Sequence, residues 1–195
     1  SKLILSPASA SCPQFAELYS TRLDMDLKRF IRDVPDFPEP GVLFRDITPL
    51  LQNAQAFRYT IDKLTERFED SGLAAVVGIE SRGFLFAAPL ASNLGLPLVP
   101  VRKPGKLPAA HMRVEYALEY GTGELDIHSD ALHRDAAVVI VDDLIATGGT
   151  AVAAAKLVEL LGARVNALAF VVELVDLGGR KRLQDYEVFS LIRYG

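Results

Sequence analysis

Short apolar runs alternate with stretches of helical periodicity along this chain. Most runs end at charged residues or glycine, as expected of strands buried on both faces of a sheet. The runs span 74–79, 97–101, 137–141, 164–174 and 186–192. Helices are predicted between them from apolar residues at helical spacing and from the glycines that follow, and they span 54–71, 84–93 and 151–161. This alternation predicts an α/β fold: a central, mostly parallel sheet flanked by helices, with right-handed crossovers.

Three stretches depart from this alternation. Residues 34–49 contain four prolines and a glycine, which predicts irregular structure, and their apolar residues favour a packed binding loop over a solvated linker. Residues 107–124 show no buried pattern and predict two hairpin-like pieces around Gly121 and Gly123. Residues 1–24 are rich in Ser, Ala and Pro. We expect an N-terminal extension of unknown role at 1–24 and a single domain at 25–195.

An acidic pair and a glycine-rich turn follow the run at 137–141. Asp142 and Asp143 come first, and the small residues 146–150 precede the predicted helix. Backbone N–H groups of such a turn can hold a phosphate at the helix N-terminus. Two carboxylates at the end of a buried strand favour ribose hydroxyls or a divalent cation as neutralising partners. An ordinary capped turn and a solvated acidic pair are the alternatives.

Basic residues follow two other predicted strands. Ser81 and Arg82 come after the run at 74–79, and Arg102, Lys103 and Lys106 come after the run at 97–101. The carboxyl ends of parallel strands meet at one edge, so these residues are expected beside the acidic pair. Arginine binds phosphate in a bidentate manner. The cluster therefore predicts a polyanionic small ligand, although a solvated surface position explains each basic residue taken singly.

Two aromatic residues and one carboxylate are weaker candidates. Phe44 could stack on a flat base, but a core phenylalanine is the better interpretation from the sequence alone. Glu119 and Tyr120 could belong to a flexible arm that closes over a site, whereas spacing alone favours an ordinary strand carboxylate for Glu119.

Charge and cysteine content exclude some classes of protein. The net charge of −4 argues against nucleic-acid binding, which requires a basic surface. The single cysteine, Cys12, cannot form an internal disulfide, so a reducing compartment is the default. No apolar run reaches the roughly 20 residues of a membrane span. We expect a cytoplasmic protein with no membrane partner.

Residues 138–150, Val-Val-Ile-Val-Asp-Asp-Leu-Ile-Ala-Thr-Gly-Gly-Thr, resemble the phosphoribosyl-pyrophosphate (PRPP) motif of the type I phosphoribosyltransferases. Further stretches resemble the members of that family that use adenine, namely 35–49, 80–86, 101–108 and 116–121. The resemblance runs from about residue 25 to the C-terminus. It implies the family fold, with a small hood or flexible loop over the site, formed near 25–50 and 103–125.

The resemblance also implies a reaction. Adenine and PRPP give AMP and pyrophosphate in purine salvage, with Mg²⁺ as cofactor, through an oxocarbenium-like transition state, in a homodimer. The magnesium is held mainly by PRPP or pyrophosphate, and its protein ligands are left open.

Each group of candidate residues acquires a role by this resemblance. The implied catalytic residues are Glu119, Asp142, Asp143 and Arg82. Those implied to hold the PRPP 5-phosphate are Ala146, Thr147, Gly148, Gly149 and Thr150. Those implied for pyrophosphate are Ser81, Arg82, Arg102, Lys103 and Lys106, with Arg102 directed to a partner subunit. Those implied for adenine are Leu43, Phe44, Arg45 and Leu144, and Tyr120 belongs to the hood.

Two alternative functions stay open at this point. One is an enzyme of the same family that uses hypoxanthine, xanthine or orotate. The other is a PRPP-binding regulator without catalysis, which would normally carry a DNA-binding domain. The length and charge of the chain argue against the second alternative.

Overall fold

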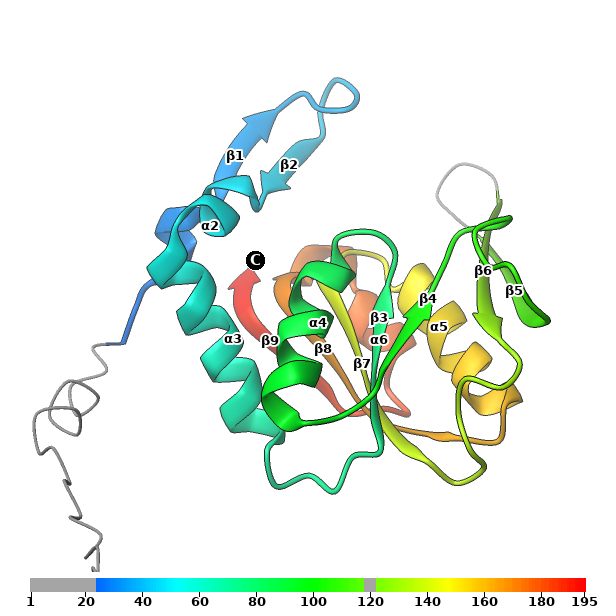
Figure 1. Cartoon of the computed structure of the whole chain (residues 1–195). Helices are drawn as coiled ribbons and strands as arrows, with labels where there is room; N and C mark the ends of the chain where they lie inside the picture. The colour runs from blue at the N-terminus through cyan, green and yellow to red at the C-terminus, as the bar shows by residue number, and fades with distance from the viewer. Residues whose placement is uncertain (1–23, 118–121) are drawn as a thin grey trace, which may run out of the picture.

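The computed structural model describes residues 24–117 and 122–195 and is built around one five-stranded sheet (Figure 1). Its strands lie in the order β4-β3-β7-β8-β9, and every neighbouring pair is parallel. Their bounds are β3 Ala75–Ile79, β4 Leu98–Val101, β7 Ala137–Ile145, β8 Arg164–Leu174 and β9 Val188–Tyr194. The predicted parallel α/β sheet is thus confirmed.

Helices cover both faces of this sheet, because its central strands are apolar on both sides. The helices α3 (Ala54–Phe68) and α4 (Gly83–Leu94) pack on one face, and α5 (Gly149–Leu160) packs on the other. Phe86 and Leu90 are buried against the first face, and Leu157 is buried against the second. Short helical segments complete the described chain: η1 Leu27–Phe30, α2 Thr48–Gln52, η2 Val175–Leu177 and α6 Gly179–Arg182.

The connections leave β3 and β7 in opposite directions. Strand β3 leads through α4 to β4 at one edge of the sheet, whereas β7 leads through α5 to β8 on the other side. The chain therefore has a topological switch point between β3 and β7. Ligands of open α/β sheets bind in the crevice outside the carboxyl ends at such a point. The residues that follow these two strands are the first candidates for a site.

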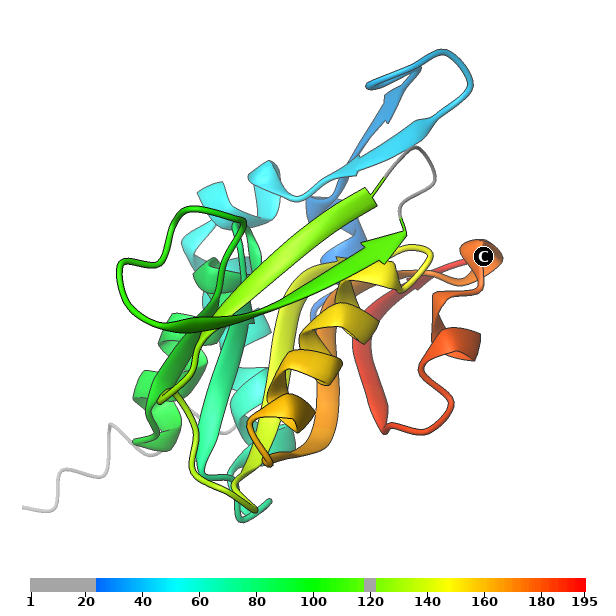
Figure 2. The same cartoon turned by 90° about the vertical axis from the view of Figure 1, so that its right-hand side faces the viewer.

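Two antiparallel hairpins accompany the sheet. One pairs β1 (Arg32–Pro35) with β2 (Leu43–Asp46), and the other pairs β5 (His111–Ala117) with β6 (Thr122–His128). In both views the first hairpin projects beyond the carboxyl-end edge of the sheet (Figures 1 and 2). The second hairpin packs on α5 and agrees with the predicted hairpin pieces.

The structure corrects two expectations. Residues 34–49 are not an irregular packed loop: they form most of the first hairpin, and Phe37 at its tip is 50% exposed. Proline is tolerated there because the two-stranded pair has free edges. The acidic pair does not end its strand either. Strand β7 continues to Ile145, since the long strand β8 supplies backbone partners as far as Glu173.

Two further points concern the ends and the surface of the chain. Apart from Asp24, the predicted N-terminal extension lies outside the described residues. Within the described ranges, no helix has the length and apolar character required to cross a membrane.

Candidate active site

A tight turn joins β7 to α5. Gly148 adopts a left-handed conformation, with φ +82°, and caps α5 from its N-terminal side. A β-carbon at this position would also lie 2.8 Å from the carbonyl oxygen of Gly179, so only glycine fits without displacing its neighbour. The turn lines a cavity of about 220 Å³ together with Asp142, Asp143 and Arg82. The backbone at the start of α5 thus meets the ligand-sized space that the sequence predicted for a phosphate.

Asp142 and Asp143 lie side by side at this cavity. Asp143 is 4% exposed and Asp142 is half-buried. Asp142 Oδ1 accepts a hydrogen bond of 2.9 Å from the backbone N–H of Asp143. Asp143 Oδ2 lies 2.9 Å from Arg82 Nε, but the pair lacks hydrogen-bond alignment and Oδ2 is otherwise unsatisfied among the described residues. Asp143 is therefore buried with incomplete neutralisation, beside the half-buried Asp142.

The pKa values of both carboxyl groups reflect this burial. Burial raises the pKa of Asp142 well above its ordinary value, and the neighbouring charge of Asp143 raises it further. Burial also raises the pKa of Asp143, although the Arg82 guanidinium opposes this effect. Two interacting acids in such surroundings share their titration. A cation or a hydroxyl-rich ligand at this position would relieve the unfavourable charge.

Gly83 allows the start of α4 to lie directly against the end of β7. A β-carbon on Gly83 would lie 2.7 Å from the carbonyl oxygen of Val141 and 3.0 Å from Asp142 Oδ1. The start of α4 therefore packs against the end of β7 with no room for a side chain. Arg82, the residue before it, is held beside Asp143 as a result.

A second, larger cavity adjoins the first. Its volume is about 760 Å³. The two cavities share Arg82, Asp142, Asp143 and Thr150. The larger one adds Ser81 and Lys103 from the turns after β3 and β4, and residues 122–125 from strand β6. The structure thus brings the predicted phosphate turn, the acidic pair and part of the predicted basic cluster to one edge of the sheet.

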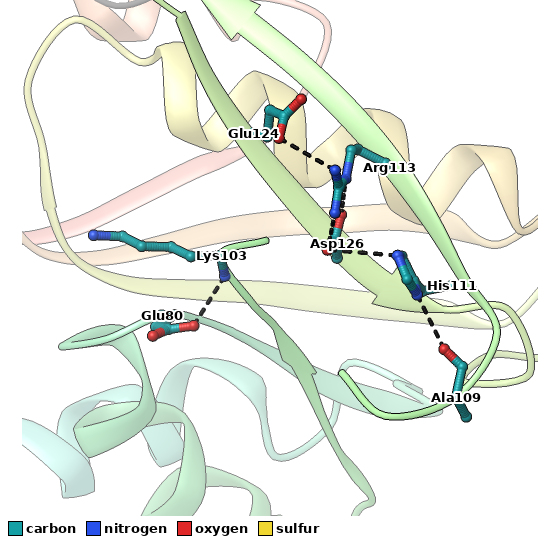
Figure 3. A network of polar contacts seen from close by, with 7 residues as sticks. All are labelled: Glu80, Lys103, Ala109, His111, Arg113, Glu124 and Asp126. Carbon is teal, nitrogen blue, oxygen red and sulfur yellow. Dashed lines mark hydrogen bonds and ion pairs between the residues drawn. The ribbon is translucent and has the colours of Figure 1, made fainter. Parts of the chain in front are cut away.

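Glu80 organises the basic segment after β4. Its Oε2 accepts hydrogen bonds from Arg102 Nε and from the backbone N–H of Lys103, both at 2.9 Å. Burial raises the pKa of Glu80, but these bonds outweigh that effect and the pKa is lowered. The Lys103 side chain extends away from Glu80 (Figure 3). Arg102 and Lys106 do not line either cavity.

Phe44 reaches the site through Arg82. The guanidinium carbon of Arg82 lies 5.6 Å from the centre of the Phe44 ring. The ring of Phe37 packs edge-on against that of Phe44, with 5.1 Å between the ring centres. Leu144 lines the smaller cavity. Arg45, in contrast, forms an ion pair with Asp33, and its guanidinium lies over the ring of Tyr194.

Leu43 and Arg45 line a separate cavity of about 540 Å³, which Phe44 does not line. Their side chains are not part of the two cavities at the sheet edge. The role implied for both residues uses their backbone, which the structure leaves as a prediction.

Asp126 ties the two strands of the hairpin β5–β6 together through its side chain and links the hairpin to the end of β4 through its backbone. Asp126 is fully buried and accepts two hydrogen bonds from Arg113, at 2.6 and 2.9 Å, which lower its pKa (Figure 3). Its backbone exchanges hydrogen bonds of 2.8 and 2.9 Å with Arg102. Glu119 and Tyr120, implied for the hood, lie outside the described residues.

Sequence reasoning did not identify three residues at this edge. Glu80 orients Arg102, Tyr116 lines the larger cavity with its hydroxyl 3.4 Å from Thr150 Oγ1, and Gly179 packs on the phosphate turn. Tyr116 pairs across the hairpin with Gly123. Since an aromatic side chain often packs over a glycine on the opposite strand, this pair could have been predicted from the sequence. The other two contacts join residues far apart in the sequence.

Protein ligands for a metal are sparse here. Within 24–117 and 122–195, no group of three or more His, Cys, Asp and Glu residues could hold a metal ion. The two buried carboxylates provide oxygen atoms, which suit Mg²⁺. They fit a magnesium ion that obtains most of its ligands from a bound diphosphate and from water.

Comparisons with known proteins agree with this geometry. Residues 47–194 match the family model described as phosphoribosyl transferase domain. An adenine phosphoribosyltransferase of Cyanothece sp. is 61% identical over 170 residues, which cover 87% of this chain and 100% of the relative. The crystal structure of adenine phosphoribosyltransferase from Thermoanaerobacter pseudethanolicus has a TM-score of 0.84 at 53% identity, covering 86% and 98% of the two chains.

The adenine phosphoribosyltransferase of Saccharomyces cerevisiae was solved in complex with an imino-altritol bisphosphate and adenine. It has a TM-score of 0.80 at 44% identity and covers 85% of this chain and 96% of that one. The resemblance that the sequence motifs carry is thereby confirmed. The chain belongs to the phosphoribosyl transferase domain family and, within it, to the adenine phosphoribosyltransferases.

Proposed function

We propose that this protein transfers the 5-phosphoribosyl group of PRPP to adenine and releases AMP and pyrophosphate, as a step of purine salvage. One observation carries the proposal: the glycine-rich turn at 146–150 and the larger cavity, to which Arg82 and Lys103 contribute positive charge, meet at Asp142 and Asp143. PRPP has a phosphate at one end, a pyrophosphate at the other and two hydroxyls between them. The relatives named above support adenine as the acceptor.

PRPP is assigned to both cavities. Its 5-phosphate occupies the smaller cavity, where the N–H groups and hydroxyls of Ala146, Thr147, Gly148, Gly149 and Thr150 receive it. Its pyrophosphate occupies the larger cavity beside Ser81, Arg82 and Lys103. Arg102 and Lys106 contribute from outside this cavity, with Arg102 serving a partner subunit.

The acidic pair lies where positive charge builds up on the ribose. In a dissociative displacement, the ribose becomes oxocarbenium-like while pyrophosphate gains negative charge. Asp142 and Asp143 stabilise the first charge and hold the hydroxyls, while Arg82 stabilises the second. Magnesium supplies Lewis-acid neutralisation of the departing pyrophosphate when bound. Because the acidic pair is buried, its charges act in surroundings of low dielectric constant, where they have more effect than in water.

The base is assigned to the space between Phe44 and Leu144. The backbone at Leu43 and Arg45 reads the edge of adenine, and the Phe44 ring, already close to Arg82, stacks on its face. By the resemblance, Glu119 is assigned to the proton of the base and Tyr120 to the hood. The hood excludes water, which would otherwise hydrolyse the ribosyl centre.

Four further features complete the proposal. Residues 25–195 form the catalytic domain, in agreement with the family match at 47–194. The enzyme depends on Mg²⁺, works as a homodimer and acts in the cytoplasm. Sedimentation equilibrium tests the dimer, and titration of activity with Mg²⁺ against EDTA tests the metal requirement.

The decisive experiment is an assay of AMP formation from PRPP with a panel of bases. Adenine should be converted far faster than hypoxanthine, guanine, xanthine or orotate. Equal turnover of another base would overturn the assignment of adenine. PRPP binding without any nucleotide product would instead indicate a regulator that has lost catalysis.

A further inference from the structure

We propose that Glu173 and Arg180 are positioning residues that set the shape of the phosphate turn at 146–150. They touch no substrate in the arrangement described above. They act through Gly179, which packs directly on the turn. This inference rests on the proposed function, because it assumes that the turn holds the 5-phosphate of PRPP.

Glu173 is a buried carboxylate near the carboxyl end of β8, the strand beside β7. It is 2% exposed. Arg180 donates to it in a bidentate manner, with Nε 2.9 Å from Oε1 and Nη2 2.6 Å from Oε2. Ser190 also donates to Oε2. Such paired bonds fix the direction of both side chains more firmly than a single contact would.

The guanidinium of Arg180 is also held by strand β9. Its Nη1 donates to the carbonyl oxygen of Val188 at 2.8 Å, and its Nη2 lies 3.1 Å from Ser190 Oγ. Arg180 belongs to the short helix α6, in which only Gly179 is buried. Leu183, which follows α6, is fully buried in the core. Leu183 therefore holds one end of α6, and Arg180 provides the polar link of this helix to β8 and β9.

Gly179, the residue before Arg180, forms the contact with the phosphate turn. A β-carbon on Gly179 would overlap the carbonyl oxygen of Ala146 and lie 3.0 Å from the backbone nitrogen of Gly148. In the opposite direction, a β-carbon on Gly148 would lie 2.8 Å from the carbonyl oxygen of Gly179. The two glycines pack backbone to backbone, so any shift of α6 is passed on to the turn.

Stability alone does not explain this network. A buried ion pair is often no more stabilising than apolar residues of the same size. Its directional bonds, in contrast, hold a backbone segment at a fixed place. Binding of a small anion requires that the groups in direct contact with it are held rigidly, because their hydrogen bonds tolerate little displacement. The location of Glu173 and Arg180, one backbone contact behind the turn, fits that requirement.

The test compares two ligands that occupy the two ends of the PRPP site. Ribose 5-phosphate carries the phosphate that the turn holds, and pyrophosphate with Mg²⁺ reports the other end. Isothermal titration calorimetry on the full chain measures both affinities for the wild type and for Arg180→Ala, Arg180→Lys, Glu173→Gln and Gly179→Ala. Arg193→Ala is the matched control, because Arg193 contacts the same Glu173 oxygen at 3.3 Å but belongs to β9 and is 58% exposed.

We expect Arg180→Ala and Gly179→Ala to weaken ribose 5-phosphate binding by about 10- to 100-fold. Pyrophosphate binding should stay within about twofold in the same variants. Arg180→Lys should recover part of the loss, because a lysine keeps the charge but not the bidentate geometry. The KM for PRPP should rise while the KM for adenine is unchanged, a split that a general loss of folding would not produce.

Two results overturn the proposal in different ways. If the wild type binds ribose 5-phosphate and Gly179→Ala and Arg180→Lys bind it equally well, the positioning role is wrong and the phosphate turn stands. If the wild type itself does not bind ribose 5-phosphate, the assignment of the turn fails, and this inference fails with it. Thermal unfolding of each variant identifies those that are folded. If Arg180→Ala does not fold, Gly179→Ala still tests the proposal, because it leaves the Glu173–Arg180 ion pair in place.

Discussion

Arg82 Nε lies 2.9 Å from Asp143 Oδ2, so the turn between β3 and α4 meets the acidic pair of β7 across the switch point. The same guanidinium lies 5.6 Å from the Phe44 ring. One side chain therefore contacts the carboxylates assigned to ribose and the aromatic ring assigned to adenine, and it lines the cavity assigned to pyrophosphate.

Arg82→Ala is expected to weaken PRPP binding by about tenfold or more, because hydrogen bonds to charged groups contribute about 1.5–3 kcal/mol. Calorimetry with PRPP and Mg²⁺ measures the affinity. Arg67→Ala is the control, since Arg67 pairs with Glu187 away from both cavities. Unchanged PRPP affinity in Arg82→Ala would remove Arg82 from the pyrophosphate site.

Asp142→Asn should make the substrate-free protein more stable at neutral pH, even though it impairs catalysis. The folded state raises the pKa of Asp142 above 3.8, its value in an exposed chain. The native protein then retains a proton that the unfolded chain has lost, so the free energy of unfolding falls as the pH rises through this range. We expect a gain of about 0.5–3 kcal/mol at pH 7, the usual size of a single-residue effect.

Urea unfolding at a series of pH values measures this difference. It should vanish below about pH 3.8, where both states carry the proton. Asp126→Asn is the contrasting control, because Arg113 lowers the pKa of Asp126 and its loss should destabilise the protein at neutral pH. A less stable Asp142→Asn at pH 7 would contradict the prediction.

Phe44→Ala should raise the KM for adenine, since stacking of a base on an aromatic ring contributes about 1–3 kcal/mol. This corresponds to roughly a tenfold increase or more, with the KM for PRPP little changed. Phe37→Ala tests the neighbouring ring, which is 50% exposed and packs against Phe44 at 5.1 Å. Steady-state kinetics with each substrate varied in turn would refute the stacking role if both variants behaved alike.

Glu119→Gln should lower kcat by about 10²–10⁴, the range of a positioned general acid or base. PRPP affinity should change much less. Rapid-quench measurement of AMP formation isolates the chemical step from product release. Glu115→Gln provides a carboxylate control, because Glu115 lies on β5 and lines neither cavity of the site. Retention of the full kcat would exclude Glu119 from the mechanism.

Arg113→Ala should loosen the hairpin that carries the hood. It leaves the buried Asp126 without its bidentate partner, so amide hydrogen exchange in β5 and β6 should become about tenfold faster or more. Exchange in β3 and β7 serves as the internal reference. The pKa of Asp126 is lowered in the fold, so the wild-type hairpin should itself loosen as the pH falls below 3.8. Equal exchange in both proteins would show that the anchor lies elsewhere.

The sheet could be predicted because buried parallel strands carry a strong local signal. Strand β8 begins and ends at the residues expected, Arg164 and Leu174. The convergence of the turns after β3, β4 and β7 followed from the direction of parallel strands alone. The sequence therefore predicts that residues 146–150, the acidic pair and Arg82 lie together, and the two cavities bring them together.

Features that depend on distant partners were not predicted. The prolines of 34–49 predict irregular structure, yet β1 and β2 pair there, with Val34 opposite Phe44. The acidic pair predicts the end of the strand at Val141, yet β7 continues to Ile145 because β8 offers backbone partners. The backbone contact of Gly179 with Gly148 depends on tertiary packing, for which neither glycine carries a local signal.

The position of β7 between β3 and β8 has a consequence for synthesis of the chain. Strand β3 leaves the ribosome well before β7, but β8 follows α5 and emerges later. Until Arg164–Leu174 is made, one apolar edge of β7 has free backbone N–H and C=O groups. Such an edge is a template for pairing with other nascent chains. The strand that supplies the acidic pair is thus exposed to aggregation during translation, and premature termination before β8 should yield insoluble chains.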